Sequence, residues 1–364
     1  MVVAQDPQHV IDHGFWVAQP GLERLRHAVQ QQPATRRAGR HGDDPAVLHE
    51  RPELFLTVDP PGYAGGRVPR FLQADFAHLP SVPPAPRRRS PGHGTHRDGS
   101  VLRVPRYDDD LRFAHVLADA ADDITTGRFR ALNLEVETKP DLTPVTDADR
   151  AAEDSLRNVL RRARPRDAVL GEEFGRAGHG SRCWVIDPID GTKNFVRGVP
   201  VWATLIGLMD GNDVVVGVVS APALGRRWWA AAGGGAWTGR SLTKATRCTV
   251  SGVTQLGDAS MSYSSLGGWE ECGRLDGFLG LTRSMWRSRA YGDFWSHVLV
   301  AEGAVDASAE PEVSLWDIAA LQVIVEEAGG RFTDIDGVRT PDGGSIVCTN
   351  GRLHEEVLAR IKAQ

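Results

Sequence analysis

The sequence predicts an α+β fold in which helices lie in layers against a mixed sheet. From about residue 108 onward, segments with helical and with strand-like periodicity alternate in blocks. They lack the strict strand-helix-strand rhythm that is typical of parallel-sheet proteins. Residues 1–104 show no sustained periodicity of either kind. We therefore expect a low-order extension over residues 1–104 and one folded domain over residues 105–364.

The predicted extension differs in composition from the rest of the chain. The first hundred residues contain 13 of the 22 prolines, 8 of the 12 histidines and no lysine, with 12 arginines against 10 acids. Such a stretch cannot bury enough apolar surface to fold. We interpret it as a disordered extension or as a segment translated from upstream of the true start. A basic tail that binds nucleic acid or an acidic partner is the alternative.

Charge, hydropathy and cysteine content exclude several classes of protein. The remaining 264 residues carry 30 basic and 37 acidic side chains, whereas a nucleic-acid binder needs clustered Lys and Arg. There is no run of eighteen apolar residues, so no membrane span is expected, and charge and proline interrupt the first residues where a secretory signal would lie. The four cysteines are widely spaced without a CxxC pair, which favours reduced thiols in a cytoplasmic protein.

The predicted elements follow one another from Asp108. A first amphipathic helix is indicated by side chains at helical spacing: Leu111, His115, Val116, Ala118 and Ile124. A second helix is predicted from Thr146, whose hydroxyl can cap it, to Pro165. Short apolar segments then predict strands at 168–173, 183–190, 203–209, 214–220 and 226–232. The last third predicts helices near 292–302, 315–328 and 353–361, with strands near 331–333 and 345–348.

The strongest motif is Asp187-Pro188-Ile189-Asp190-Gly191-Thr192, at the end of an apolar strand. Its two carboxylates are hard oxygen ligands of the kind that Mg²⁺ prefers. The Gly-Thr turn opens a predicted helix and adds a hydroxyl and free backbone N–H groups, which bind anions. In the alternative interpretation, Asp190 only caps that helix and Asp187 is solvated. That alternative explains one acid but not the further acids of the chain.

Two more acids occupy similar places. Glu172, in Gly-Glu-Glu, and Asp317, in Leu-Trp-Asp-Ile-Ala-Ala, each stand at the end of an apolar segment. An unpaired charge is costly there unless a cation awaits it. Considered alone, Glu172 could be an ordinary surface acid, and Asp317 could be an acid in the first turn of a helix, where the helix dipole favours it. Together, the four acids suggest a multi-metal site that binds a phosphate.

These three motifs, in this order and spacing, resemble the inositol monophosphatase superfamily of Mg²⁺-dependent phosphomonoesterases. The resemblance covers roughly residues 108–362. It implies a layered αβαβα sandwich, a homodimer, and two or three Mg²⁺ ions. The metal ligands that it implies are Glu172, Asp187 and the Ile189 carbonyl for one ion, Asp187, Asp190 and Asp317 for the second, and Glu172 with waters for a weaker third.

The resemblance also implies the remaining catalytic residues. Thr192, paired with Asp147, would orient and activate the attacking water, and Lys139 resembles the lysine of a mobile loop that closes over the metals. Backbone N–H groups of Gly191 and Thr192 would hold the phosphate. A metal-activated water suffices as nucleophile. This agrees with the absence of any CX5R or GxSxG arrangement from the sequence.

Two further acids, Asp293 and Glu310, bear on the substrate. In inositol-type members the position matching Asp293 is commonly small or neutral, and the position matching Glu310 binds a hydroxyl. Acids at both positions favour a positively charged leaving group, such as that of histidinol phosphate. Segments such as SAPALGRRWWAA and RAYGDF resemble the actinobacterial histidinol-phosphate phosphatase branch. The alternative role for Asp293 is to cap the helix that starts there.

Other functions remain as alternatives. The first is a broader inositol-monophosphate or sugar-phosphate phosphatase with the same chemistry. The second, from another class, is a non-catalytic binding protein with a basic N-terminal tail. The leading hypothesis is Mg²⁺-dependent hydrolysis of histidinol phosphate in histidine biosynthesis, with neither nucleic acid nor membrane as partner.

Overall fold

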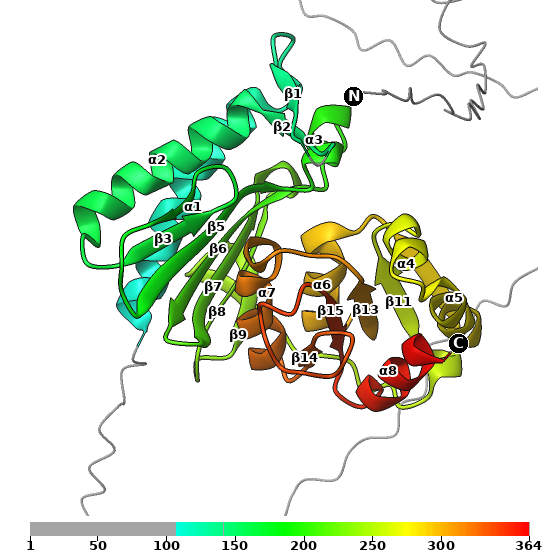
Figure 1. The fold of residues 1–364 in the computed structure, drawn as a ribbon. Coiled ribbons are helices and arrows are strands. Elements are labelled where there is room, and N and C mark those ends of the chain that lie inside the picture. The colour runs from blue at the N-terminus through cyan, green and yellow to red at the C-terminus, as the bar shows by residue number, and fades with distance from the viewer. Residues whose placement is uncertain (1–106, 141, 364) are drawn as a thin grey trace, which may run out of the picture. The chain divides into compact units, whose positions relative to one another are not determined.

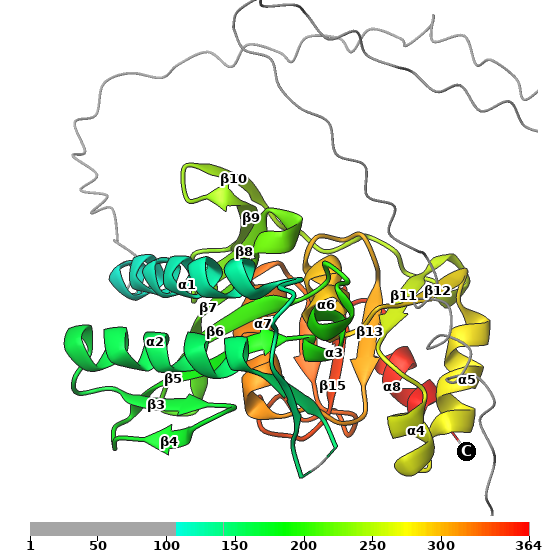
Figure 2. The ribbon, with the colours of Figure 1, turned by 90° about the horizontal axis from the view of Figure 1, so that it is seen from above.

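The computed structural model describes residues 107–140 and 142–363. The extension predicted for residues 1–104 lies outside this range, so the predicted domain boundary stays a prediction. The described residues belong to one unit, in which helices and sheets alternate in five layers (Figure 1, Figure 2). This arrangement confirms the αβαβα sandwich.

The larger sheet has eight strands in the order β10-β9-β8-β7-β6-β5-β3-β4. All neighbours are antiparallel except β3 and β5, which are parallel. The strands are β3 (Ala168–Gly171), β4 (Gly175–Ala177), β5 (Arg182–Asp190), β6 (Ala203–Asp210), β7 (Asp213–Ala221), β8 (Arg226–Ala231), β9 (Ala236–Ser241) and β10 (Lys244–Arg247). Helix α3 (Thr192–Arg197) follows β5, and a short 3-10 helix η1 (Pro222–Leu224) follows β7.

Two neighbouring helices, α1 (Asp108–Arg128) and α2 (Asp147–Ala163), cover one face of this sheet. The buried face of α1 consists of Ala114, Leu117, Ala118 and Ala121, whereas Val116 of the predicted apolar stripe is 53% exposed. Thr146 caps α2 as predicted, and a hairpin of β1 (Val136–Thr138) and β2 (Pro144–Thr146) precedes it.

The central layer consists of α6 (Asp293–Ala301) and α7 (Leu315–Glu327), which contact each other between the two sheets. Helix α7 lies against the centre of the larger sheet, where Gly207 and Gly217 allow its backbone to approach. A Cβ atom at Gly217 would lie 2.2 Å from the Ala320 carbonyl oxygen, so glycine is required there. This close packing fixes the start of α7 relative to the end of β5.

The smaller sheet has the order β12-β11-β13-β15-β14. Its strands are β11 (Ser260–Tyr263), β12 (Arg287–Ala290), β13 (Ala307–Glu310), β14 (Arg331–Thr333) and β15 (Ile346–Thr349). One face of this sheet lies against α6, and the opposite face is covered by α5 (Leu275–Ser284) and α8 (His354–Lys362). Helix α4 (Gly267–Glu271) lies beside α5, and the 3-10 helix η2 (Leu256–Asp258) precedes β11. The sequence analysis predicted β14, β15 and α8 but not α5 or β11–β13.

Alternation along β5 divides the core between the layers. Trp184 and Ile186 are buried against α1 and α2, whereas Val185 is buried in the core that includes α6 and α7. All four cysteines are free thiols, as expected from their spacing. No helix in the described part of the chain is long and apolar enough to cross a membrane.

Candidate active site

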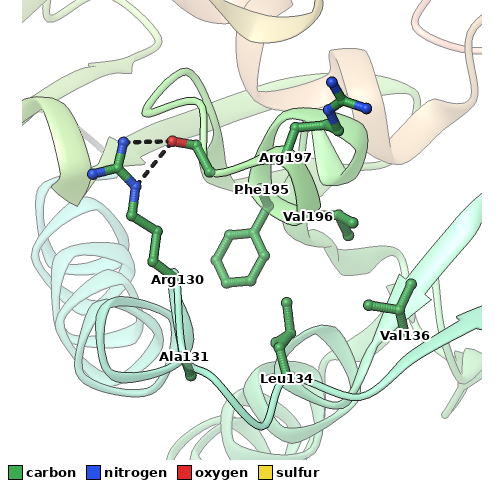
Figure 3. Close-up of a pocket in the computed structure, with 8 residues that line it drawn as sticks. Arg130, Ala131, Leu134, Val136, Phe195, Val196 and Arg197 are labelled. Carbon is green, nitrogen blue, oxygen red and sulfur yellow. Dashed lines mark hydrogen bonds between the residues drawn. The ribbon is translucent and has the colours of Figure 1, made fainter. Parts of the chain in front are cut away.

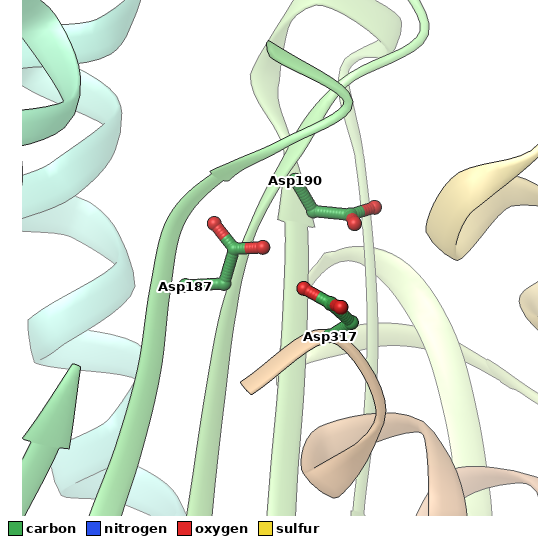
Figure 4. Close-up of side chains that lie close together, drawn as sticks. All are labelled: Asp187, Asp190 and Asp317. Atoms are coloured by element: carbon green, nitrogen blue, oxygen red, sulfur yellow. The ribbon is translucent and has the colours of Figure 1, made fainter. Parts of the chain in front are cut away.

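Three aspartate side chains meet where β5 ends and α7 begins (Figure 4). One carboxylate oxygen from each of Asp187, Asp190 and Asp317 lies within 4.8 Å of the other two. Residues three apart point to opposite faces of a regular strand, but the β5–β6 register is irregular between Asp187 and Asp190. This irregularity lets both carboxylates reach the same site. Asp317 is held in place because its Oδ2 accepts a hydrogen bond from the Ser314 N–H over 2.7 Å.

Asp187 and Asp190 are buried, and Asp317 is partly buried. Among residues 107–140 and 142–363, no Lys, Arg or His side chain forms an ion pair with any of them. Burial, and then neighbouring carboxylates, raise the pKa of Asp187 and of Asp190 well above the usual range. Burial above all raises the pKa of Asp317 to about 7. Like charges gathered in a buried place are costly unless a cation joins them, so this set of hard oxygen donors fits a divalent ion such as Mg²⁺.

Glu172 lies beside this cluster because β3 and β5 are parallel neighbours. Gly171 pairs with Ile186, and the Glu172 N–H donates a hydrogen bond to the Ile186 carbonyl over 3.2 Å. Glu172 Oε1 lies 2.6 Å from Lys139 Nζ, which also donates to Glu173 Oε1 over 2.7 Å. Burial opposes the charge of Lys139, but the two carboxylates outweigh it and raise the lysine pKa. The predicted loop lysine therefore contacts the predicted ligand Glu172.

A buried glutamate that the sequence analysis missed holds the turn that carries Glu172. Glu153 of α2 is fully buried, accepts a hydrogen bond from the Glu173 N–H over 2.7 Å, and pairs with Arg157 over 2.7 Å. A Cβ atom at Gly171 would lie 2.1 Å from Glu153 Oε1, so the carboxylate occupies space that only glycine leaves open. In the sequence, Glu153 and Arg157 have the i,i+4 spacing of an ordinary ion pair on a helix surface.

The acid next to Thr192 is Asp149. Thr192 Oγ1 donates a hydrogen bond to the Ile189 carbonyl over 2.9 Å and lies 3.5 Å from Asp149 Oδ1. Asp149 is fully buried, and burial raises its pKa to about 7. The Thr192 hydroxyl, at the start of α3, therefore lies next to the Asp149 carboxylate, whose pKa is raised. Asp149 is also close enough to Asp187 to add to the effect of burial on the pKa of that aspartate.

The expected pair of Thr192 with Asp147 is wrong. Asp147 instead forms an ion pair with Arg128 over 2.5 Å. The reason lies in the cap of α2: Thr146 is the N-cap, so Asp149 is the third helical residue and bonds back to Thr146 in a capping box. The Thr-x-x-Asp spacing was the signal in the sequence that distinguishes Asp149 from Asp147.

The turn at Gly191 brings the end of β5 close to the start of α6. Gly191 has a φ of +81°, and a Cβ atom there would lie 3.1 Å from Asp293 Oδ2. Asp293 is the first residue of α6, after the N-cap Gly292, and its carboxylate accepts a hydrogen bond from Asn194 over 3.3 Å. Asp293 therefore does not cap the helix. Burial, and then the charge of Glu310, raise its pKa to about 8.

Glu310 reaches the same site from the smaller sheet. It is buried at the end of β13, close enough to raise the pKa of Asp190, Asp293 and Asp317 in addition to the larger effect of burial. Asp190 in turn accepts a hydrogen bond from the Phe294 N–H over 2.7 Å, which ties β5 to α6. The two acids predicted to bind the substrate thus lie next to the predicted metal ligands.

A separate pocket of about 450 Å³ borders α3 but contains none of these acids (Figure 3). Its lining consists of Arg130, Ala131, Leu134, Val136, Phe195, Val196, Arg197 and Gly198. Because the chemistry-bearing groups lie elsewhere, we place the candidate active site at the carboxylates and not in this pocket.

Known proteins are similar to this chain over the region that carries the carboxylates. The sequence model of the inositol monophosphatase family matches residues 107–364. A histidinol-phosphatase of Streptomyces coelicolor is 66% identical over 259 residues, which cover 70% of this chain and 97% of that protein. A histidinol-phosphatase of Mycobacterium tuberculosis is 60% identical over 256 residues, covering 70% and 98%. A solved inositol monophosphatase from Zymomonas mobilis has a TM-score of 0.63 at 30% identity, covering 71% of this chain and 99% of that one.

Proposed function

The chain belongs to the inositol monophosphatase family, and from this premise we propose that it hydrolyses L-histidinol phosphate to L-histidinol and phosphate. The observation that carries the proposal is the meeting of two groups of acids. Asp187, Asp190 and Asp317 fit metal ions, and Asp293, at the start of α6, and Glu310, at the end of β13, lie beside them. Histidinol phosphate carries a phosphate for the first group and an ammonium and an imidazole for the second. This reaction is the dephosphorylation step of histidine biosynthesis.

We assign Mg²⁺ as the cofactor, in two or three ions. The ligands that would hold it are Glu172, Asp187, the Ile189 carbonyl, Asp190 and Asp317. When bound, Mg²⁺ neutralises the charge on the phosphate and acidifies a water molecule. The fit rests on Asp187, Asp190 and Asp317, none of which pairs with a cationic side chain within the described residues.

Thr192 and the acids beside it orient and deprotonate the attacking water. The Thr192 hydroxyl holds the water, and the neighbouring Asp149 carboxylate takes up its proton; a pKa of about 7 suits this task near neutral pH. Glu172 is a second acceptor beside the same water. The N–H groups of Gly191 and Thr192 hold the phosphate oxygens. Lys139 closes the site through its contact with Glu172.

Steady-state hydrolysis of L-histidinol phosphate and of inositol 1-phosphate, with Mg²⁺ or with EDTA in its place, tests the proposal. We expect kcat/KM to be at least about tenfold higher for L-histidinol phosphate, the size of one charge-assisted hydrogen bond. EDTA should abolish hydrolysis of both esters. An equal or inverted preference would overturn the substrate and favour a broad inositol or sugar phosphatase. Metal-independent hydrolysis would overturn the cofactor.

We also propose that two copies of the chain associate in the cytoplasm as a homodimer. Support comes from the edge strand β12, which is flanked by the large exposed side chains of Trp286 (67% exposed) and Tyr291 (61% exposed). A second copy that covers this edge would bury both side chains and protect the outer edge of β12, since β11 pairs only with its inner edge. Light scattering that finds a monomer would contradict this assignment.

A further inference from the structure

We propose that His297 is a positioning residue that holds the Glu310 carboxylate toward the positively charged end of the substrate. The inference rests on the proposed function, because it assigns Glu310 to the leaving group. No motif of the sequence pointed to His297, and the reaction outlined above does not use it. Its place between two elements of the site is the observation that suggests the role.

His297 bridges α6 and β13 with both ring nitrogens. Its Nδ1 lies 2.9 Å from Ser308 Oγ, and its Nε2 lies 3.3 Å from Glu310 Oε1. Ser308 and Glu310 are two apart on β13 and therefore share one face of the strand. His297 stands one helical turn after Asp293 on α6, so the two share one face of the helix. One imidazole thus links the two elements that carry the predicted substrate acids.

Glu310 has an unsatisfied oxygen at this contact. The Glu310 side chain is 9% exposed and that of His297 is 2% exposed. Oε1 is buried without a hydrogen-bond partner in the described structure, since the contact with His297 lacks hydrogen-bond geometry. A buried carboxylate oxygen left in this state is costly. A small rotation of the carboxylate that brings Oε1 into line with the imidazole N–H would satisfy this oxygen and leave Oε2 for a cation.

The chemistry of a neutral imidazole suits this task. When the Ser308 hydroxyl donates to Nδ1, the ring proton lies on Nε2 and faces Glu310 Oε1. A neutral donor orients the carboxylate and leaves its negative charge available to the substrate. Lysine or arginine at this place would cancel that charge, as Lys139 does for Glu172 and Glu173. His297 therefore contributes to the choice of leaving group and not to the chemistry at phosphorus.

Two polar substitutions at the same position separate this role from a structural one. In His297→Gln, the amide nitrogen reaches the position of Nε2 and can still donate to Glu310. In His297→Asn, the shorter amide reaches only the position of Nδ1 and Ser308. We expect His297→Asn to raise KM for L-histidinol phosphate about tenfold, the size of one lost hydrogen bond to a charged group, with kcat nearly unchanged. The loss with inositol 1-phosphate should be smaller, because its hydroxyl groups are neutral and gain less than a cation from a correctly held carboxylate. His297→Gln should resemble the wild type with both esters.

The outcomes distinguish this inference from the proposed function. A wild-type enzyme without preference for L-histidinol phosphate overturns the proposed function and this inference with it. A wild-type preference that survives in His297→Asn, or an equal loss with both esters, overturns only the inference. Thermal unfolding checks that each variant folds. If His297→Asn does not fold, Ser308→Ala frees the imidazole and should raise the same KM in the same direction; an unchanged KM then overturns the role.

Discussion

Acids gather at both ends of strand β5, in opposite electrostatic settings. At its start, Arg182 Nη2 lies 2.7 Å from Asp110 Oδ1, and Arg182 Nε lies 3.3 Å from Asp167 Oδ1. At its end, Asp187 and Asp190 are buried among further acids, and no cationic side chain of residues 107–140 and 142–363 pairs with them. Burial is common to both ends. The end that we propose for the active site differs in having no cationic side chain paired with its acids among the described residues.

This difference explains why one end of β5 is suited to a ligand. Where an arginine already neutralises the carboxylates, a metal ion gains little by binding. Breaking such an ion pair mainly lowers the stability of the fold. Acids that repel each other instead gain from any divalent cation that enters. Substitutions at either end of β5, or at the residues that support it, test this difference.

Removing an acid from the end proposed for the active site should have the largest effect. Asp190→Asn should lower kcat/KM for L-histidinol phosphate by about a thousandfold or more, because a metal supplies several kcal/mol of transition-state stabilisation. In EDTA the variant should melt at the same or a higher temperature, since burial and neighbouring acids make the Asp190 charge unfavourable without a cation. Activity assays and thermal unfolding measure the two effects. Activity within tenfold of the wild type would contradict a metal-binding role.

A smaller effect is expected from the acid beside Thr192. Asp149→Asn should lower kcat about a hundredfold, as is typical for loss of a general base, without changing the Mg²⁺ requirement. Asp147→Asn is the matched control two residues away. Because Asp147 contacts Arg128 and not Thr192, we expect its kcat to stay within about threefold of the wild type. If Asp147→Asn lowers kcat more than Asp149→Asn does, the pair of Thr192 with Asp147 that was expected from the sequence would be supported instead.

Glu153 shares a feature with each end of β5. It pairs with a cation, Arg157, and it also accepts a hydrogen bond from the turn that carries Glu172. Glu153→Gln should raise the Mg²⁺ concentration for half-maximal activity about tenfold, the usual effect of a residue that orients a metal ligand. Calorimetric titration with Mg²⁺ provides a readout independent of catalysis. Asp154→Asn, an exposed neighbour on the same helix, is the control and should bind Mg²⁺ normally. Unchanged Mg²⁺ affinity in Glu153→Gln would show that the turn holds without this carboxylate.

The parts of the site that could be predicted from the sequence depend on local structure. Asp187, Asp190 and Thr192 belong to one strand end and the turn after it, so a single motif places them together. Glu172 directly follows the short strand β3, and Asp317 lies in the first turn of the apolar helix α7. Local structure also contained the one wrong pair. Two acids in the first turn of α2 differ only in their distance from the cap Thr146, and the cap decides which one turns inward.

Contacts between distant segments could not be predicted. Glu153 acts on a backbone N–H 20 residues away, and nothing in a helical pattern distinguishes it from a surface acid. His297 requires knowledge of which strand lies beside α6. Strand β11 alternates polar and apolar residues over only four positions, which is too short to predict a strand, and β12 carries Arg287 and Arg289 and shows no apolar alternation. These two strands are therefore products of tertiary packing.

The smallest effect on activity should come from the opposite end of β5. Arg182→Met removes the cation of Asp167 and leaves Asp110 only the longer contact with Arg164 Nε, at 3.5 Å, although the two acidic side chains are only 9% and 12% exposed. We expect the free energy of unfolding to fall by about 2 kcal/mol, with kcat/KM of the folded enzyme within about twofold of the wild type.

The stability loss in Arg182→Met should shrink as the pH falls below neutral, because protonation neutralises carboxylates that have lost the Arg182 charge. Urea unfolding at neutral and acidic pH measures this change. Arg182→Lys, which keeps the charge, should lose less stability and show less pH dependence. A large loss of activity in folded Arg182→Met would remove the distinction between the two ends of the strand, since the paired acids would then also serve the reaction.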